Sequence, residues 1–155
     1  MKSLLLLLTL CTAMTIRANA LVITEVFSNP VGDDIGREWI EIYNPTGADI
    51  DISSLSLSIK GGAPIAVSLV SGGVQLPPNS YAVIGSTVGG VTKFLQDYPT
   101  YNGILLRATM SLVNTGVTSL DLRISGSVVD AISSYTAAKE GFSYGKQSTG
   151  VFAVM

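Results

Sequence analysis

The sequence contains no histidine and a single cysteine, Cys11. The lack of histidine removes the commonest general base, the commonest metal ligand and any Ser-His-Asp or Cys-His nucleophile system. The glycine pairs Gly61-Gly62 and Gly89-Gly90 lack the strand-to-helix context that a phosphate-binding loop requires. These absences predict a chain that is not an enzyme and that needs no cofactor.

Charged side chains are also scarce, at 13% of the residues, and the formal net charge at pH 7 is −2. The basic residues Lys60, Lys93, Arg107 and Arg123 are scattered and form no stripe with interleaved aromatic residues. A weakly acidic chain of this kind is poorly suited to polyanions, so we expect no nucleic-acid partner.

The first twenty residues have the pattern of a secretory signal peptide. Lys2 provides a positive start, an apolar run follows from Leu4 to Leu10, and Ala18-Asn19-Ala20 is a small-x-small cleavage site. We therefore expect residues 1–20 to be removed and residues 21–155 to form one secreted domain, extracellular or periplasmic. This domain has no cysteine for a disulfide, and it has no apolar run long enough to span a membrane after cleavage.

The stretch from residue 38 to residue 59 predicts two β-strands joined by a turn. Ile40 and Ile42 fall on one face of the first strand, and the other face carries Trp39, Glu41 and Tyr43. Over residues 54–59, Leu55, Leu57 and Ile59 alternate with serines, and residues 44–47 (NPTG) supply turn chemistry. A period of two indicates strands with one buried and one exposed face.

The rest of the chain repeats this pattern of short strands and turns rich in glycine, proline and asparagine. A first strand over residues 21–28 places Ile23, Glu25 and Phe27 on one face and Val26 on the other. Residues 92–98 predict a helical turn capped by Thr92. Further strands are expected over 65–70, 81–85, 104–107 and 111–113, and over 119–125, where Leu120, Leu122 and Ile124 share one face. A last strand is expected over 127–133 with Val128, Asp130 and Ile132 on one face. Such spacing predicts an all-β sandwich or barrel.

Five segments, in this order, resemble the lamin tail domain family, in its secreted bacterial form. The segments are LVITEV (21–26), EWIEIYNPT (38–46), DIDISSLSLS (49–58), LPPNSYAVIG (76–85) and SLVNTGVTSLDLRISGSVVDAI (111–132). The resemblance covers nearly all of residues 21–147 and implies an immunoglobulin-like β-sandwich. This sequence lacks the tryptophan usual in the strand after EWIEIYNPT and the usual closing tryptophan. Either VFAV (151–154) is a divergent last strand or the sequence is incomplete.

Two groups of residues are candidate sites. Asp33, Asp34 and Glu38 could offer oxygen ligands to Ca²⁺ at the mouth of a loop. We favour the alternative, in which the aspartates begin a turn, Arg37 neutralises them, Glu38 and Glu41 lie on a solvated face, and no metal binds. Trp39, Glu41 and Tyr43 could form a binding surface for a carbohydrate or a protein. The alternative, which we favour, is that Trp39 packs beneath a neighbouring loop.

These observations predict a non-catalytic module that binds a protein or a cell surface, as in adhesion, with a partner whose identity the sequence does not give. One alternative is a structural protein that assembles through an open sheet edge. The family resemblance implies another, because bacterial members often accompany secreted nucleases and phosphatases: an accessory subunit or domain of a secreted hydrolase.

Overall fold

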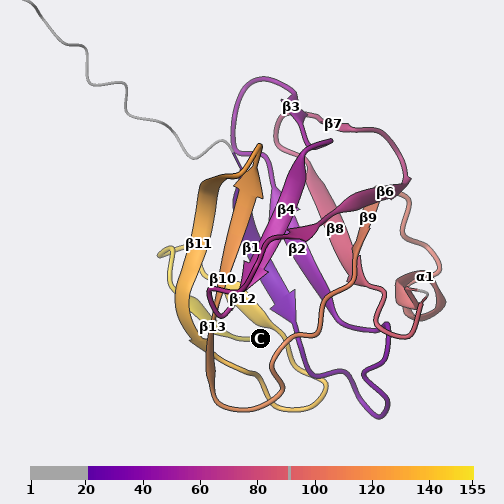
Figure 1. Cartoon of the computed structure of the whole chain (residues 1–155), viewed down its shortest axis with the longest axis vertical. Coiled ribbons are helices and arrows are strands. Elements are labelled where there is room, and N and C mark those ends of the chain that lie inside the picture. The colour runs from indigo at the N-terminus through magenta and orange to yellow at the C-terminus, as the bar shows by residue number, and fades with distance from the viewer. Residues whose placement is uncertain (1–20, 91) are drawn as a thin grey trace, which may run out of the picture.

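The computed structural model describes residues 21–90 and 92–155, so the predicted signal peptide lies outside the described residues. The chain forms a sandwich of β-sheets, as predicted (Figure 1). The seven-stranded sheet has the order β13 (Phe152–Val154), β12 (Tyr144–Lys146), β1 (Val22–Phe27), β2 (Trp39–Tyr43), β8 (Tyr81–Ser86), β9 (Ile104–Ala108) and β6 (Ser68–Ser71). All neighbours in it are antiparallel except β8 and β9, which are parallel.

The second layer is a four-stranded antiparallel sheet. Its order is β11 (Ser127–Thr136), β10 (Val117–Ile124), β4 (Leu55–Ile59) and β5 (Ile65–Ala66). A two-stranded ribbon pairs β3 (Ile50–Asp51) with β7 (Gln75–Leu76). Figure 1 shows β4, β10 and β11 lying over the larger sheet, with the short helix α1 (Phe94–Asp97) at its side. This arrangement confirms the fold class expected from the sequence.

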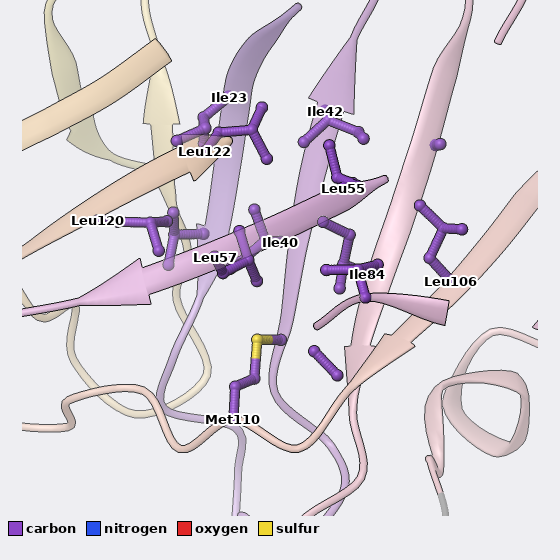
Figure 2. Packing of buried hydrophobic residues seen from close by; sticks show 14 of the residues in the cluster. Ile23, Ile40, Ile42, Leu55, Leu57, Ile84, Leu106, Met110, Leu120 and Leu122 are labelled. Carbon is purple, nitrogen blue, oxygen red and sulfur yellow. The ribbon is translucent and has the colours of Figure 1, made fainter. Parts of the chain in front are cut away.

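The main hydrophobic core fills the space between the two large sheets (Figure 2). Six residues that the alternation assigns to inward faces are all buried in this core: Ile40, Ile42, Leu55, Leu57, Leu120 and Leu122. Met110, from the segment between β9 and β10, closes one end of the core. The period of two therefore identifies the core faces of β2, β4 and β10 correctly.

A smaller apolar cluster lies on the outer face of the seven-stranded sheet. Trp39, Val83 and Leu105 come from the neighbouring strands β2, β8 and β9, and Phe94 of α1 packs against them. The helix belongs to the crossover that the parallel pair β8–β9 requires. The helix begins at Phe94 with Lys93 as its N-cap residue, so the predicted cap at Thr92 is wrong, although Thr92 Oγ1 accepts the backbone N–H of Phe94 at 3.3 Å. The α1 segment thus covers one part of the outer face of the seven-stranded sheet and leaves another part open.

The predicted faces of the first strand are wrong beyond Ile23. The register of β1 against β2 shifts between Ile23 and Glu25, so Ile23 and Val26 both face the main core. Phe27 instead lies on the outer face, where it stacks on Trp39 with ring centroids 5.4 Å apart. A bulge at Thr24 adds one residue to the strand, and one extra residue reverses the alternation that follows.

Three other predicted strands differ from the structure. Residues 65–70 do not form one strand, because the chain crosses from β5 in one sheet to β6 in the other around the buried Val67. Residues 111–113 are not a strand. In β11, a register shift displaces Val128, which is exposed although Ile132 is buried. The crossing from β5 to β6 and the register shift in β11 both depend on pairing with strands that are distant in sequence. The local alternation of apolar residues therefore does not reveal them.

Candidate functional site

A pair of tyrosines occupies the open part of the outer sheet face. Tyr43 of β2 and Tyr81 of β8 are direct cross-strand partners, with ring centroids 4.6 Å apart and planes inclined by 34°. Tyr43 is half-buried, whereas 51% of Tyr81 is exposed. We call these two residues the tyrosine platform. Cross-strand aromatic pairs stabilise a sheet, and here the pairing also holds the exposed ring in a defined position.

Two asparagines hold the turns at this end of the sheet. Asn44 is fully buried, and its side-chain Nδ2 donates to the carbonyl oxygens of Ala48 at 2.8 Å and Leu76 at 2.9 Å. The backbone N–H of Asn79 donates to the carbonyl oxygen of Asn44, and the Tyr43 hydroxyl donates to Asn79 Oδ1 at 3.1 Å. Asn79 has a φ of 53°, a left-handed conformation that asparagine tolerates better than most residues. The platform is therefore tied to both turns.

An open cleft of about 590 Å³ adjoins Tyr81. It lies between the turn after β6, the turn before β8 and the start of β9. Its polar side chains are Gln75, Asn79, Ser80 and Asn102, and none of the residues that line it carries a charge. The Tyr101 hydroxyl donates to the carbonyl oxygen of Ile104 at 2.9 Å and so fixes the loop that carries Asn102. We call this feature the amide cleft.

Two glutamates lie on the same outer face, one row away from the platform. Glu25 of β1 is the cross-strand partner of Glu41 of β2, and the Thr24 hydroxyl donates to Glu41 Oε1 at 2.7 Å. Burial raises the pKa of Glu41, the hydrogen bond from Thr24 lowers it, and the charge of Glu25 raises it again. Neither glutamate lines the amide cleft. Two carboxyl groups with this proximity could transfer protons, but they could not do so to a ligand held in the amide cleft.

Trp39 is separated from the other two residues of the predicted binding surface. Only 8% of it is exposed, because Phe27 stacks on it and Phe94 and Tyr98 meet it edge-on at 6.1 and 5.9 Å. It is covered by the α1 segment, so its ring does not present a face for stacking on a ligand. The predicted surface is thus divided, because Trp39 is buried whereas Glu41 and Tyr43 are half-buried.

The two aspartates of the candidate metal loop have protein partners. Asp33 accepts the backbone N–H of Ile35 at 3.1 Å and lies 3.5 Å from Lys93 Nζ; the Ile35 bond is the main reason that its pKa is lowered. Asp34 accepts a hydrogen bond from the side-chain amide of Asn114. Among the described residues, no group of three or more histidine, cysteine, aspartate or glutamate side chains is placed to hold a metal ion.

Arg37 and Glu38 differ from their expected roles in this loop. The closest carboxylate to Arg37 is Asp97 of α1, at 2.8 Å, so Lys93 rather than Arg37 forms the ion pair with Asp33. Glu38 is not on a solvated face: 4% of it is exposed, and both of its carboxylate oxygens accept the backbone N–H of Leu112. The alternation of side chains along an extended strand indicates this burial, because Glu38 shares a face with Ile40 and Ile42.

The residues that the sequence did not single out are Tyr81, Asn79 and Asn102. Tyr81 and Asn79 belong to the conspicuous segment LPPNSYAVIG, whose proline and asparagine predict a turn before a strand. They lie beside Tyr43 and Asn102 because β8 pairs with β2 on one side and with β9 on the other. These three strands are separated in the sequence. The local sequence carries no signal for that pairing.

Comparison with known proteins relates this chain to one protein family. A family model described as Lamin Tail Domain matches residues 15–136, which is most of the chain. No curated protein matches the chain, and neither does any solved structure. In the part of the chain that the structure describes, no helix has the length and apolar character needed to cross a membrane. The match and the sandwich agree with each other, and we conclude that this chain belongs to the lamin tail domain family, whose fold is an immunoglobulin-like β-sandwich.

Proposed function

We propose that this protein is a secreted, non-catalytic module that binds a protein or cell-surface partner through the tyrosine platform. The observation that carries the proposal is the exposed ring of Tyr81, held against Tyr43 at the edge of the amide cleft. Exposed aromatic residues that are held rigidly lose little conformational entropy on binding, and such residues often dominate interfaces. Clefts of several hundred Å³ with a few polar groups are the usual form of binding sites.

Binding is favoured over catalysis by the placement of the acidic groups. The chain has no histidine, and the cross-strand partners Glu25 and Glu41 both lie outside the amide cleft. A general acid or base must lie within hydrogen-bond reach of the proton that it transfers. The cleft itself offers amides and a hydroxyl, which bind and orient but do not titrate near neutral pH.

Secretion is part of the proposal and rests on the residues 1–20, which have the charge, the apolar run and the cleavage site of a leader. N-terminal sequencing of the protein recovered from the culture medium or the periplasm should begin at Leu21. A product that begins at Met1, or that carries a lipid on Cys11, would overturn this part.

The experiment that tests binding uses cell envelopes of the producing organism as the probe. Fluorescently labelled protein is titrated onto intact cells and onto isolated envelopes, with Tyr81→Ala as the test variant and Phe142→Ala as the matched control. Phe142 is as exposed as Tyr81, at 49%, but lies outside the residues that line the amide cleft. We expect saturable binding that Tyr81→Ala weakens about tenfold and Phe142→Ala leaves unchanged. Equal binding by both variants would contradict a role for the platform.

A second candidate, assembly of copies through a sheet edge, is favoured by the strand β6. This strand ends the seven-stranded sheet, all four of its residues are exposed, and Leu69 and Val70 are among them. An uncharged edge strand offers unpaired backbone groups to another chain. Sedimentation at rising concentration should show association that Leu69→Lys abolishes. A monomer at all concentrations would exclude this candidate.

A further inference from the structure

The polar side chains of the amide cleft are all uncharged. Gln75, Asn79 and Asn102 carry side-chain amides, and Ser80 adds a hydroxyl. An amide presents two donors and an acceptor, and a hydroxyl presents both kinds of group on one atom. No lysine, arginine, aspartate or glutamate lines the cleft. The ligand that satisfies this set is uncharged and carries several groups that both donate and accept hydrogen bonds.

The rim of the cleft adds a flat apolar surface. Half of Tyr81 is exposed there, and its position is fixed by the Tyr43 ring, which is itself tied to Asn79 Oδ1 at 3.1 Å. A sugar ring has the complementary form, because one of its faces presents C–H groups while its perimeter carries hydroxyls. Apolar contact with an aromatic face, together with hydrogen bonds to amides, satisfies both parts of such a ring.

We propose that the amide cleft and Tyr81 bind a neutral glycan chain, so that the partner is a carbohydrate of a cell surface. The inference rests on the proposed binding function and specifies its ligand. The Tyr81 ring packs on the apolar face of one sugar residue. The side chains of Gln75, Asn79 and Asn102 bind its hydroxyls, and the open cleft leaves room for the neighbouring residue of the chain.

Charge argues against an acidic glycan at this site. Glu25 and Glu41 lie on the same outer face one row from the platform, and the chain has a formal net charge of −2. A carboxylated or sulfated polysaccharide would find no cation among the cleft residues to compensate its charge. Electrostatics therefore selects neutral chains over acidic ones.

The sheet topology argues against an extended peptide at the same place. A peptide that adds to a sheet needs a strand with a free edge. Tyr81 lies on β8, which is paired on one side with β2 and on the other with β9. β8 is thus an interior strand that offers no free edge to a peptide, and recognition at the platform has to come from side chains.

The test is affinity electrophoresis of the full chain in native gels. The gels contain a neutral polysaccharide (dextran, laminarin or hydroxyethyl-cellulose) or an acidic one (polygalacturonate or alginate). We expect at least one neutral polysaccharide to retard the protein, with an affinity that Tyr81→Ala lowers about tenfold and that Tyr81→Phe, which keeps the ring, lowers less than about threefold. Phe142→Ala serves as the control and should migrate like the wild type.

A second variant protects the test against a folding defect. Asn102 is exposed and lies in a loop, so Asn102→Ala should leave the thermal melt unchanged while it weakens retardation several-fold. The inference is overturned if no neutral polysaccharide retards the protein, if only the acidic ones do, or if Tyr81→Ala and Asn102→Ala both migrate like the wild type. If no neutral polysaccharide retards the protein but envelope binding still requires Tyr81, the proposed binding function stands and only the glycan ligand is excluded.

Discussion

Both carboxylate oxygens of Glu38 accept the backbone N–H of Leu112, at 3.0 and 3.1 Å, across 74 positions of the chain. This contact joins the start of β2 to the segment between β9 and β10. Burial raises the pKa of Glu38 to about 7; the Leu112 N–H lowers it, and the charge of Asp34 raises it. This buried carboxyl group with a single backbone donor therefore titrates close to physiological pH, where its neutral and ionised forms are both populated.

The first prediction concerns the pH dependence of stability. The pKa of Glu38 in the folded chain, about 7, lies above its ordinary value of 4.5. The folded state therefore holds this proton more tightly than the unfolded state does, and the associated stability is complete below pH 4.5 and lost as pH rises through 7. The loss is at most about 3 kcal/mol, and urea titrations at pH 5 and pH 8 would measure it.

Glu38→Gln is the variant that isolates this effect. Glutamine keeps an oxygen for the Leu112 N–H and has no charge to bury, so the variant should be more stable than the wild type at pH 8. The pKa of Glu41 is also raised, so its titration also lowers the stability of the fold as pH rises. This smaller pH dependence remains in Glu38→Gln. A free energy of unfolding in the wild type that does not fall between pH 5 and pH 8 would contradict the assignment to Glu38.

The second prediction concerns the core of the sandwich. Ile42 is completely buried and lies between Ile23 of β1 and Ala82 of β8 in the sheet. Ile42→Ala should lower the free energy of unfolding by roughly 2–5 kcal/mol, because it removes buried methyl groups and leaves a cavity. Val31→Ala, at a residue that is 67% exposed, is the control and should change stability by less than about 0.5 kcal/mol. A loss below about 1 kcal/mol at Ile42 would place it outside the core.

The third prediction concerns calcium. Asp33 is satisfied by Ile35 and Lys93, and Asp34 by Asn114, so neither carboxylate needs a cation. Millimolar Ca²⁺ should leave the Tm unchanged. Free Ca²⁺ at 100 times the Kd of a site in this loop would stabilise the fold by about 2.7 kcal/mol, which a thermal melt would show. A calcium-dependent rise that disappears in the double variant Asp33→Asn/Asp34→Asn would make this loop a metal site.

Much of the fold could be predicted because most strands have one apolar face. The alternation in β2, β4 and β10 places Ile40, Leu57 and Leu122 in the core, where the structure has them. The same rule fails in β1, because a bulge at Thr24 has no residue signature and reverses the faces after it. The same alternation places Glu38 on the core face with Ile40 and Ile42, where it is buried despite its charge.

The candidate site was predictable only in part. Tyr43 and Glu41 lie on the outer face, as the pattern of β2 indicates. Trp39 has the same alternation but is covered by the crossover that carries α1, and no local pattern reveals which end of a sheet face a crossover covers. Tyr81 and Asn102 join the site through the non-local pairing of β8 with β2 and β9.

An NMR titration tests most directly whether the open part of the outer face is the binding surface. Amide chemical shifts of ¹⁵N-labelled protein would be followed while solubilised envelope carbohydrate from the producing organism is added. The binding surface described here predicts shifts that saturate and that centre on Gln75, Asn79, Tyr81 and Asn102. Shifts centred instead on the exposed edge strand β6 or on the loop around Phe142, with the cleft amides unmoved, would contradict it.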